Sequence, residues 1–211
     1  MKKVYANHTL FLLFTAFSVF ITSQSCKNKT ENISQIQPDD QPAFTEYELN
    51  DPQTIQSFLY EAFQGNTEEV LSYLNRGMDI NQANRSGQTA LMMAAYNGNT
   101  GLVQWCIDKG AEVDARDAGG RTALMYASSG PFTETVKFLL RHGADPNTKD
   151  LEEKWTALMY AASEGHMKVV KLLVKHGANP SFADIEGDTA ESFARKNGHQ
   201  EVADWLEKHS K

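Results

Sequence analysis

The chain has 211 residues, of which 41% are hydrophobic and 22% are charged, with 20 basic and 27 acidic residues and a formal net charge of −7. This length accommodates one domain with an additional segment, and the apolar content is sufficient for a buried core. The two cysteines, Cys26 and Cys106, are too few for a disulfide scaffold, and the negative charge gives little support for sequence-independent binding to nucleic acid or to an anionic membrane surface.

Residues 1–25 have the organisation of an export signal. Lys2 and Lys3 precede an apolar block, LFLLFTAFSVFI at residues 10–21, and no acidic residue occurs before Glu31. Twelve residues are too few to cross a hydrocarbon core, which requires about 20, so a signal peptide is favoured over a membrane-spanning helix.

The end of this segment resembles a bacterial lipoprotein signal, in which a small residue precedes a cysteine that becomes lipidated. Ser25 and Cys26 fit that pattern, whereas Ser23 stands where the family prefers an aliphatic residue. The resemblance implies lipidation at Cys26, with Lys27 favouring an outer-membrane destination. An ordinary cleaved signal peptide and an uncleaved anchor remain alternatives.

Residues 26–51 are polar, contain two prolines within PDDQP, and show no apolar periodicity, which predicts a flexible tether. Removal of residues 1–25 takes away two lysines and no acidic residue, leaving 18 basic and 27 acidic residues and a charge of −9. The exported part is therefore distinctly acidic.

Beyond residue 51 the sequence repeats. Four copies of a similar segment place threonines at positions 89, 122, 156 and 189, with spacings of 33, 34 and 33 residues, and a degenerate copy precedes them. The period predicts five structural units, at about 52–84, 85–117, 118–151, 152–184 and 185–211, within a repeat domain of residues 52–211.

Each unit predicts two short antiparallel helices. Thr89 is typical of a helix start, apolar residues follow it at helical spacing, and Gly98 ends the helix. A second apolar helix then ends at Gly110, and the polar loop that leads to the next threonine predicts a tight turn or short hairpin. Helices this short are marginal alone, so neighbouring units must stack.

These features resemble the ankyrin repeat, whose 33-residue unit is a β-turn followed by two antiparallel helices. The family's Thr-Pro-Leu-His appears here as Thr-Ala-Leu-Met, and its closing motif appears as Gly143, Ala144, Asp145, Pro146 and Asn147. The resemblance implies an all-α solenoid with hairpin-like fingers. One extra residue between Asn147 and Thr156, and Lys154 in place of the motif glycine, predict a finger of different shape.

The sequence holds no recognisable catalytic, cofactor or metal pattern. The histidines of the repeats recur at equivalent positions, which favours structural roles, and no Cys/His spacing suits zinc. Cys106 falls on an apolar helix stripe, which predicts a buried, inert thiol. The alternating charges of Asp114, Arg116 and Asp117 are typical of a solvated turn, with a weak cation site as the alternative.

In the resembled family, partners contact the finger tips and the exposed side of the first helix, along a concave strip. The matching positions are Arg85, Gln88, Tyr96, Asn97, Arg121, Trp155, Glu164, Ile185 and Asp188. We expect Trp155 to be an exposed binding residue; alternatively, the insertion tucks it against its own repeat. Trp105 and Trp205 both lie 16 residues after a repeat threonine, where core packing is expected.

We therefore expect a monomeric, non-enzymatic module that binds a protein partner, takes no cofactor, metal or nucleic acid, and contacts the membrane only through its anchor. The expected location is the periplasm or outer membrane of a Gram-negative bacterium. The alternative is an acidic immunity-type inhibitor, or a stress-protective accessory of an envelope enzyme, that binds a basic partner. A hydrolase or redox enzyme is disfavoured by the missing catalytic pattern.

Overall fold

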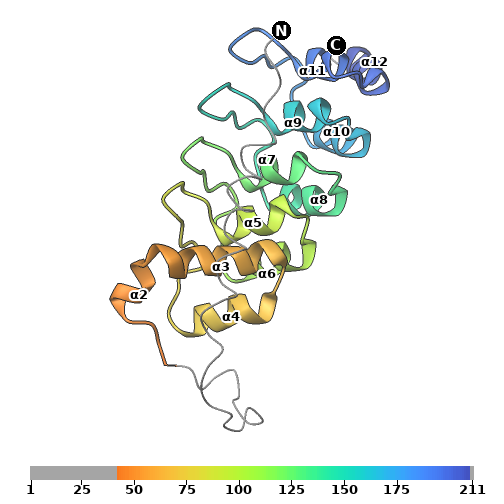
Figure 1. The fold of residues 1–211 in the computed structure, drawn as a ribbon. Helices are drawn as coiled ribbons and strands as arrows, with labels where there is room; N and C mark the ends of the chain where they lie inside the picture. Colours follow the sequence, from red (N-terminus) through yellow and green to blue (C-terminus); the bar gives the residue numbers. More distant parts are fainter. Residues whose placement is uncertain (1–41, 210–211) are drawn as a thin grey trace, which may run out of the picture. The chain divides into compact units, whose positions relative to one another are not determined.

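The computed structural model describes residues 42–209, which form a stack of helix pairs (Figure 1). A short helix, α2 (Glu46–Asn50), precedes them. The five pairs are α3 (Pro52–Gln64) with α4 (Thr67–Asn75), α5 (Ala90–Tyr96) with α6 (Thr100–Asp108), α7 (Ala123–Ser128) with α8 (Thr133–Arg141), α9 (Ala157–Ser163) with α10 (Met167–Lys175), and α11 (Ala190–Lys196) with α12 (Gln200–His209). The predicted all-α repeat solenoid is confirmed.

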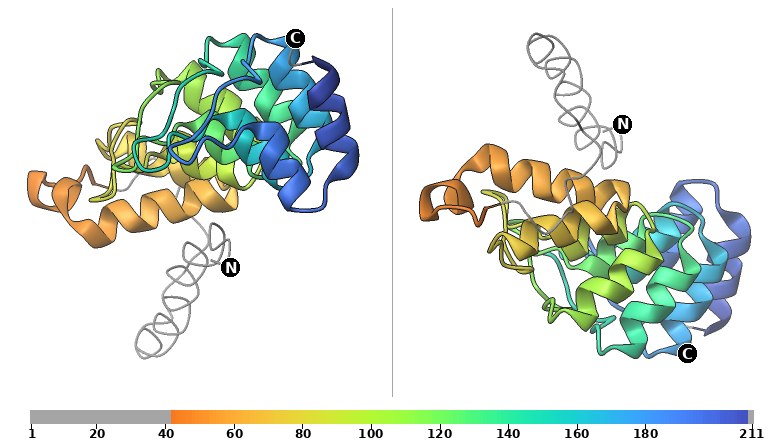
Figure 2. Two further views of the ribbon diagram at one scale, coloured as in Figure 1. Left: turned by 90° about the horizontal axis from the view of Figure 1, so that it is seen from above. Right: turned by 90° about the horizontal axis from the view of Figure 1, so that it is seen from below.

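The helices form two rows, seen from two further directions in Figure 2. The first helices of the units, α3, α5, α7, α9 and α11, contact one another in sequence, and α6, α8, α10 and α12 do so in the second row. The longest described helix, α3, has 13 residues. No helix in residues 42–209 has the length and apolar character needed to cross a bilayer.

Threonine starts four of the first-row helices, as the sequence predicts. The hydroxyl of Thr89 accepts a 3.4 Å hydrogen bond from the Met92 N–H, and Thr122, Thr156 and Thr189 cap their helices in the same way. Fully buried alanines at the equivalent positions 94, 127, 161 and 194 of the last four units let adjacent helices approach closely. Threonine capping fixes where each of these helices begins, and the small alanine side chains fix how closely neighbouring first-row helices approach.

Four loops, which we call fingers 1 to 4, connect successive units and comprise residues 76–89, 109–122, 142–156 and 176–189. Each turns through a left-handed residue two positions before its threonine: Gly87, Gly120 and Gly187 have φ angles of 74°, 77° and 88°, and Lys154 has 64°. Finger 3 thus holds a bulky residue in a conformation that favours glycine. Among residues 42–209, Lys154 is the single non-glycine residue with positive φ.

The segment before the first unit is structured from residue 42 onward, which corrects the end of the predicted tether. The Phe44 ring stacks on Tyr73 at 5.7 Å, and the Arg76 guanidinium lies 3.5 Å from the centre of the Phe44 ring. Thr45 caps α2. Hydrogen bonds from the backbone N–H and the side chain of Thr45 lower the pKa of the Glu48 carboxyl. Residues 26–41, like the predicted signal, lie outside the described residues.

The second-row tryptophans are less buried than predicted. Trp105 and Trp205 are both half-buried, and a lysine ammonium lies over each ring, Lys109 at 5.5 Å and Lys171 at 5.8 Å from the ring centre. The position 16 residues after the threonine therefore faces the edge of the second row, where long basic side chains cover the rings.

Candidate functional site

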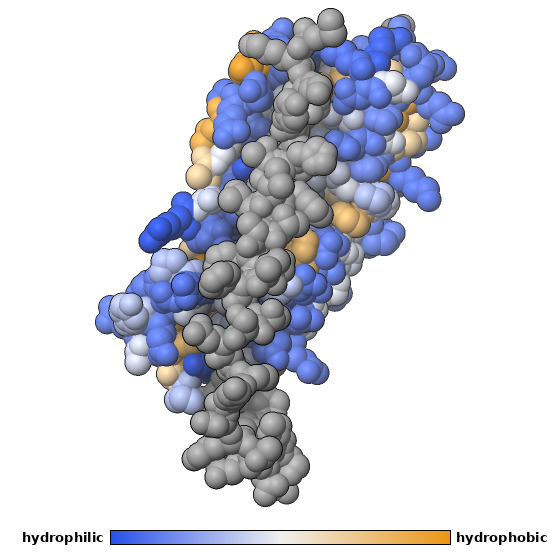
Figure 3. Space-filling view, viewed as in Figure 1, coloured by the Kyte–Doolittle hydropathy of each residue, from blue (hydrophilic) through white to orange (hydrophobic). Residues whose placement is uncertain are grey.

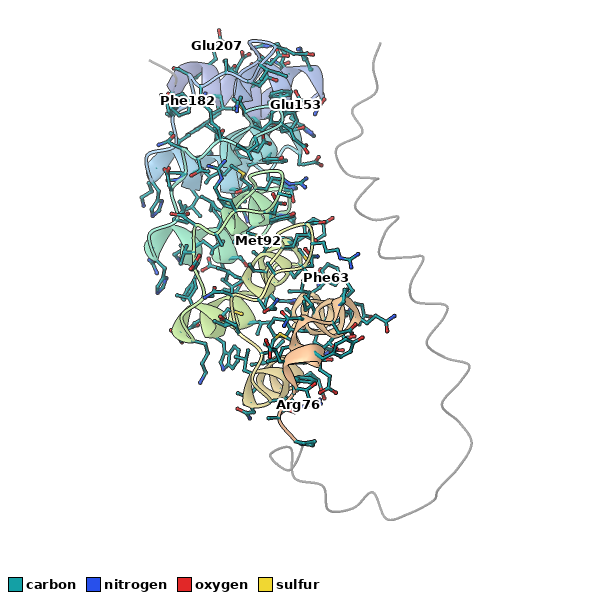
Figure 4. All side chains as sticks on the ribbon, turned by 90° about the vertical axis from the view of Figure 1, so that its left-hand side faces the viewer. Phe63, Arg76, Met92, Glu153, Phe182 and Glu207 are labelled. Carbon is teal, nitrogen blue, oxygen red and sulfur yellow. The ribbon has the colours of Figure 1, made fainter. Side chains whose placement is uncertain are left out.

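The fingers stand side by side and form one continuous surface with the exposed side of the first-row helices, which we call the finger face. Figure 4 looks onto the fingers, with Glu153 labelled toward the end of the stack that holds α11 and α12. Three backbone hydrogen bonds join neighbouring tips: Ala118 N–H to Ser86 O (2.8 Å), Leu151 N–H to Gly119 O (2.8 Å), and Ile185 N–H to Glu153 O (3.1 Å). These bonds fix the relative positions of the tips.

A buried polar network supports the first half of this face. The Tyr126 hydroxyl donates a 2.7 Å hydrogen bond to the Asp117 carboxylate, which also accepts one from Arg121 Nε at 3.1 Å. Gln88 Nε2 in turn donates to the Tyr126 oxygen at 3.1 Å. Burial raises the pKa of Tyr126, so the phenol is neutral at ordinary pH and acts as a donor.

Asp117 is 5% exposed, so its predicted place in a solvated turn is wrong. A buried carboxylate needs several hydrogen bonds, and Tyr126 and Arg121 provide them. Asp114 and Arg116 of the same turn are exposed. Within residues 42–209, no group of three or more acidic, histidine or cysteine side chains could hold a metal ion.

The same arrangement recurs one unit later. The Tyr160 hydroxyl donates to Asp150 Oδ2 at 3.0 Å, and the Trp155 N–H donates to Asp150 Oδ1 at 3.2 Å. Burial, reinforced by the charge of Asp150, raises the pKa of Tyr160. The sequence carries a signal for this pairing: a tyrosine four residues after the threonine occurs in the two units whose preceding finger buries an aspartate.

Aromatic rings extend along the first-row helices in two groups. Tyr96 lies 6.0 Å from Phe63 and 5.8 Å from Tyr126. Trp155 lies 5.1 Å from Tyr160 and 4.3 Å from Phe193, measured between ring centres. Each group links successive units, so these rings stabilise the stack as well as shape its surface.

Eight of the nine predicted partner-binding side chains are accessible on the finger face. Arg85, Asn97 and Ile185 are exposed, and the half-buried ones are Tyr96, Arg121, Trp155, Glu164 and Asp188. Several are engaged locally: the Asn97 amide donates to Phe63 O at 3.0 Å, and Asp188 pairs with Lys196. These side chains are therefore accessible, and some are held in place by local contacts, while their role in partner binding stays a prediction.

Two of these residues differ from the prediction. Gln88 is 8% exposed, and its amide bonds Asn84 and Tyr126, so it supports the fingers instead of facing a partner. Trp155 was predicted to be exposed, yet it is half-buried between its own unit and the next. The alternative prediction, that Trp155 packs within its own repeat, accounts for its contact with Tyr160 but not for its contact with Phe193 of the next unit.

Leu151 is not among the predicted partner-binding residues, because the insertion in finger 3 obscures its equivalence to tip positions such as Ile185. These two residues are exposed apolar side chains on adjacent tips, at 56% and 60%. In Figure 3, orange patches interrupt the mostly blue surface along the finger side where grey atoms do not cover it.

The described histidines and the described cysteine have structural surroundings. His166 Nε2 lies 3.2 Å from Ser129 O, and the ring of His199 packs against Gly165. Cys106 is fully buried, as predicted, and burial raises the pKa of its thiol to about 12. A thiol with this pKa is almost entirely protonated at neutral pH and is therefore a poor nucleophile.

Comparison with known proteins gives one family. A family model described as ankyrin repeats (3 copies) matches residues 58–150 and 134–211. Together the two matches cover more than half of the chain and include the helices of every described unit from within α3 onward. A search of curated proteins found no match.

Proposed function

Because the chain belongs to the ankyrin-repeat family, we propose that it is a non-enzymatic module that binds a protein partner through its finger face. Ankyrin repeats are generally protein–protein interaction modules and usually lack catalytic activity. The family relationship supports the class of function, and the finger face supplies the surface.

The main support for this proposal is the row of finger tips joined by backbone hydrogen bonds. Backbone hydrogen bonds between the tips hold the main chain in place, and the outward side chains at the tips differ: Arg85, Ala118, Leu151 and Ile185. A fixed backbone with variable side chains binds with little loss of conformational entropy, which favours specific recognition of a protein surface.

The second part of the proposal is display in the bacterial envelope by lipid attached to Cys26. Its support is the basic start, the short apolar block and the small residues before Cys26. Residues 27–41 would then connect the lipid to the repeats. Replacement Cys26→Ala is expected to move the chain from the membrane fraction to the soluble periplasmic fraction, whereas unchanged fractionation would contradict the anchor.

A second candidate is an acidic inhibitor, or accessory, that neutralises or assists a basic envelope enzyme. The charge of the exported part favours it, because acidic surfaces increase the rate of association with basic partners. Association that weakens steeply between about 50 and 200 mM salt, mainly through a lower association rate, would support this candidate. Weak salt dependence would favour recognition by apolar contacts.

Affinity capture from envelope extract tests the proposed function. The bait is the full-length chain, compared with a variant carrying Arg85→Ala and Asn97→Ala on the finger face and a control carrying Gln104→Ala and Lys171→Ala on exposed second-row positions. A partner retained by the parent and the control but lost by the finger-face variant is the expected result. A partner lost only by the second-row variant would contradict binding through the finger face.

A further inference from the structure

Two adjacent finger tips carry an exposed combination of apolar and acidic side chains. Leu151 and Ile185 are 56% and 60% exposed, and the hydrogen bond from Ile185 N–H to Glu153 O joins their fingers directly. We name the acidic tip surface by its residues: Leu151, Glu152, Glu153, Ile185 and Glu186.

Charge on the fingers changes along the stack. Finger 1 presents Arg85 at its tip, whereas finger 4 contains three carboxylates, Asp184, Glu186 and Asp188, and no lysine or arginine. Glu152, Glu153 and Glu186 are all exposed. The end of the finger face near α11 and α12 therefore concentrates negative charge beside apolar side chains.

The basic groups close to this surface make local contacts, including the exposed Arg116, whose Nη2 donates to Lys149 O at 2.6 Å. The Lys149 ammonium lies 3.3 Å from Ala183 O and 4.4 Å from the centre of the Phe182 ring, below the tips. Lys196 pairs with Asp188, and Lys154 Nζ lies 3.5 Å from Leu151 O. Of these lysines, only Lys196 is paired with a carboxylate, and no salt bridge among the described residues involves Glu152, Glu153 or Glu186, so three exposed carboxylates lie around Leu151 and Ile185 without an ion-pair partner.

We infer that the acidic tip surface binds a protein segment in which lysine or arginine residues alternate with aliphatic or aromatic residues. This inference rests on the proposed function and specifies the chemistry of its partner. The carboxylates of fingers 3 and 4 complement the basic groups, and Leu151 and Ile185 supply apolar area next to them. A partner segment with only basic residues would not match the apolar side chains of this surface, and one with only apolar residues would not match its carboxylates.

The test is selection of random 12-residue peptides, displayed on phage, against the purified full-length chain. Enriched peptides are expected to combine basic and apolar residues. Their affinity is then measured for Ile185→Ser, for Leu151→Ser with Ile185→Ser, and for Glu153→Gln with Glu186→Gln. The single Ile185 variant is included because Leu151 also packs over Gly120, where an added Cβ would lie 2.6 Å from Leu151 Cγ.

The apolar variants are expected to bind about tenfold more weakly, and the glutamine variant several-fold more weakly with a reduced dependence on salt. The matched control is Glu201→Gln, at an exposed carboxylate on α12 in the second row, which is expected to leave affinity unchanged. Arg85→Gln, at the corresponding tip of finger 1, distinguishes the acidic tip surface from the rest of the finger face. Circular dichroism equal to that of the parent confirms that each variant is folded.

Selection of acidic peptides, or of none, would overturn the inference, as would affinities that the Leu151, Ile185 and glutamate changes leave unaltered. Peptides lost with Arg85→Gln but not with the tip variants would refute the acidic tip surface and leave binding through the finger face intact. Peptides lost only with Gln104→Ala and Lys171→Ala would refute both the inference and the proposed function.

Discussion

The indole of Trp155, from finger 3, lies 4.3 Å from the ring of Phe193 in α11, so a finger side chain of one unit packs against the first helix of the next. The residue with the strongest aromatic signature of a binding site thus also joins the last unit to the stack. Loss of partner binding in a Trp155 variant would therefore have two explanations.

Replacement Trp155→Ala is expected to lower the free energy of unfolding by about 2 kcal/mol, less than for a fully buried tryptophan because the side chain is half-buried. Urea unfolding measures this change, and hydrogen exchange is expected to accelerate most in α11 and α12. Tyr47→Ala, at a side chain that is 82% exposed, is the control and is expected to change the stability little. Unaltered exchange in α11 would refute this role of Trp155.

Lys154 adopts a φ of 64° at the position where the other three fingers have glycine. Replacement Lys154→Gly is expected to stabilise the chain by about 1 kcal/mol, because the left-handed conformation is unfavourable for a residue with a Cβ. Lys154→Ala keeps the Cβ and is expected to give no such gain. Equal stabilities of the glycine and alanine variants would show that backbone strain is not the cause.

Burial raises the pKa of both Tyr126 and Tyr160 above the ordinary value of 10.0. Above that value the unfolded chain loses the phenolic protons while the folded chain keeps them, so the free energy of unfolding falls as the pH rises. Below it these two groups contribute their full stability. Urea unfolding between pH 9 and about 11 measures the slope.

Replacements Tyr126→Phe and Tyr160→Phe are expected to flatten that slope. Each also removes a hydrogen bond to a buried aspartate, at a cost of about 1 kcal/mol near neutral pH. Tyr60→Phe, at an exposed position on α3, is the control and is expected to retain the parental slope. A slope unaffected by these two replacements would contradict the raised pKa values of Tyr126 and Tyr160.

The Cys106 thiol, with a pKa raised to about 12, is expected to react with a disulfide reagent only when the chain unfolds. In a Cys26→Ala background, where Cys106 is the single remaining thiol, labelling at pH 8 is expected to be very slow without urea and rapid above the unfolding midpoint. Rapid labelling of the native chain would refute the burial of this residue.

Local signals in the sequence were sufficient to predict the helix pairs. The threonine spacing located the starts of α5, α7, α9 and α11, and the glycine pattern identified Lys154 as the exception. These features depend on neighbouring residues within one unit, where capping and backbone geometry determine the structure.

The differences involve contacts between units. Gln88 is buried because its amide meets the hydroxyl of Tyr126, 38 positions later, and Asp117 is buried by the same tyrosine. Phe44 is ordered by its contacts with Tyr73 and Arg76. Such positions look polar or isolated in the linear sequence, and only the stacking of the units determines their exposure.

Site-specific photocrosslinking in the cells that produce the chain tests binding through the finger face most directly. A photoreactive amino acid is placed singly at Arg85 or Ile185 on the finger face and at Gln104 or Lys171 on the second row, all exposed positions. Binding through the finger face predicts a discrete protein adduct at Arg85, Ile185 or both, and none at Gln104 or Lys171. Adducts confined to Gln104 and Lys171, or no adduct at any of the four positions, would contradict it.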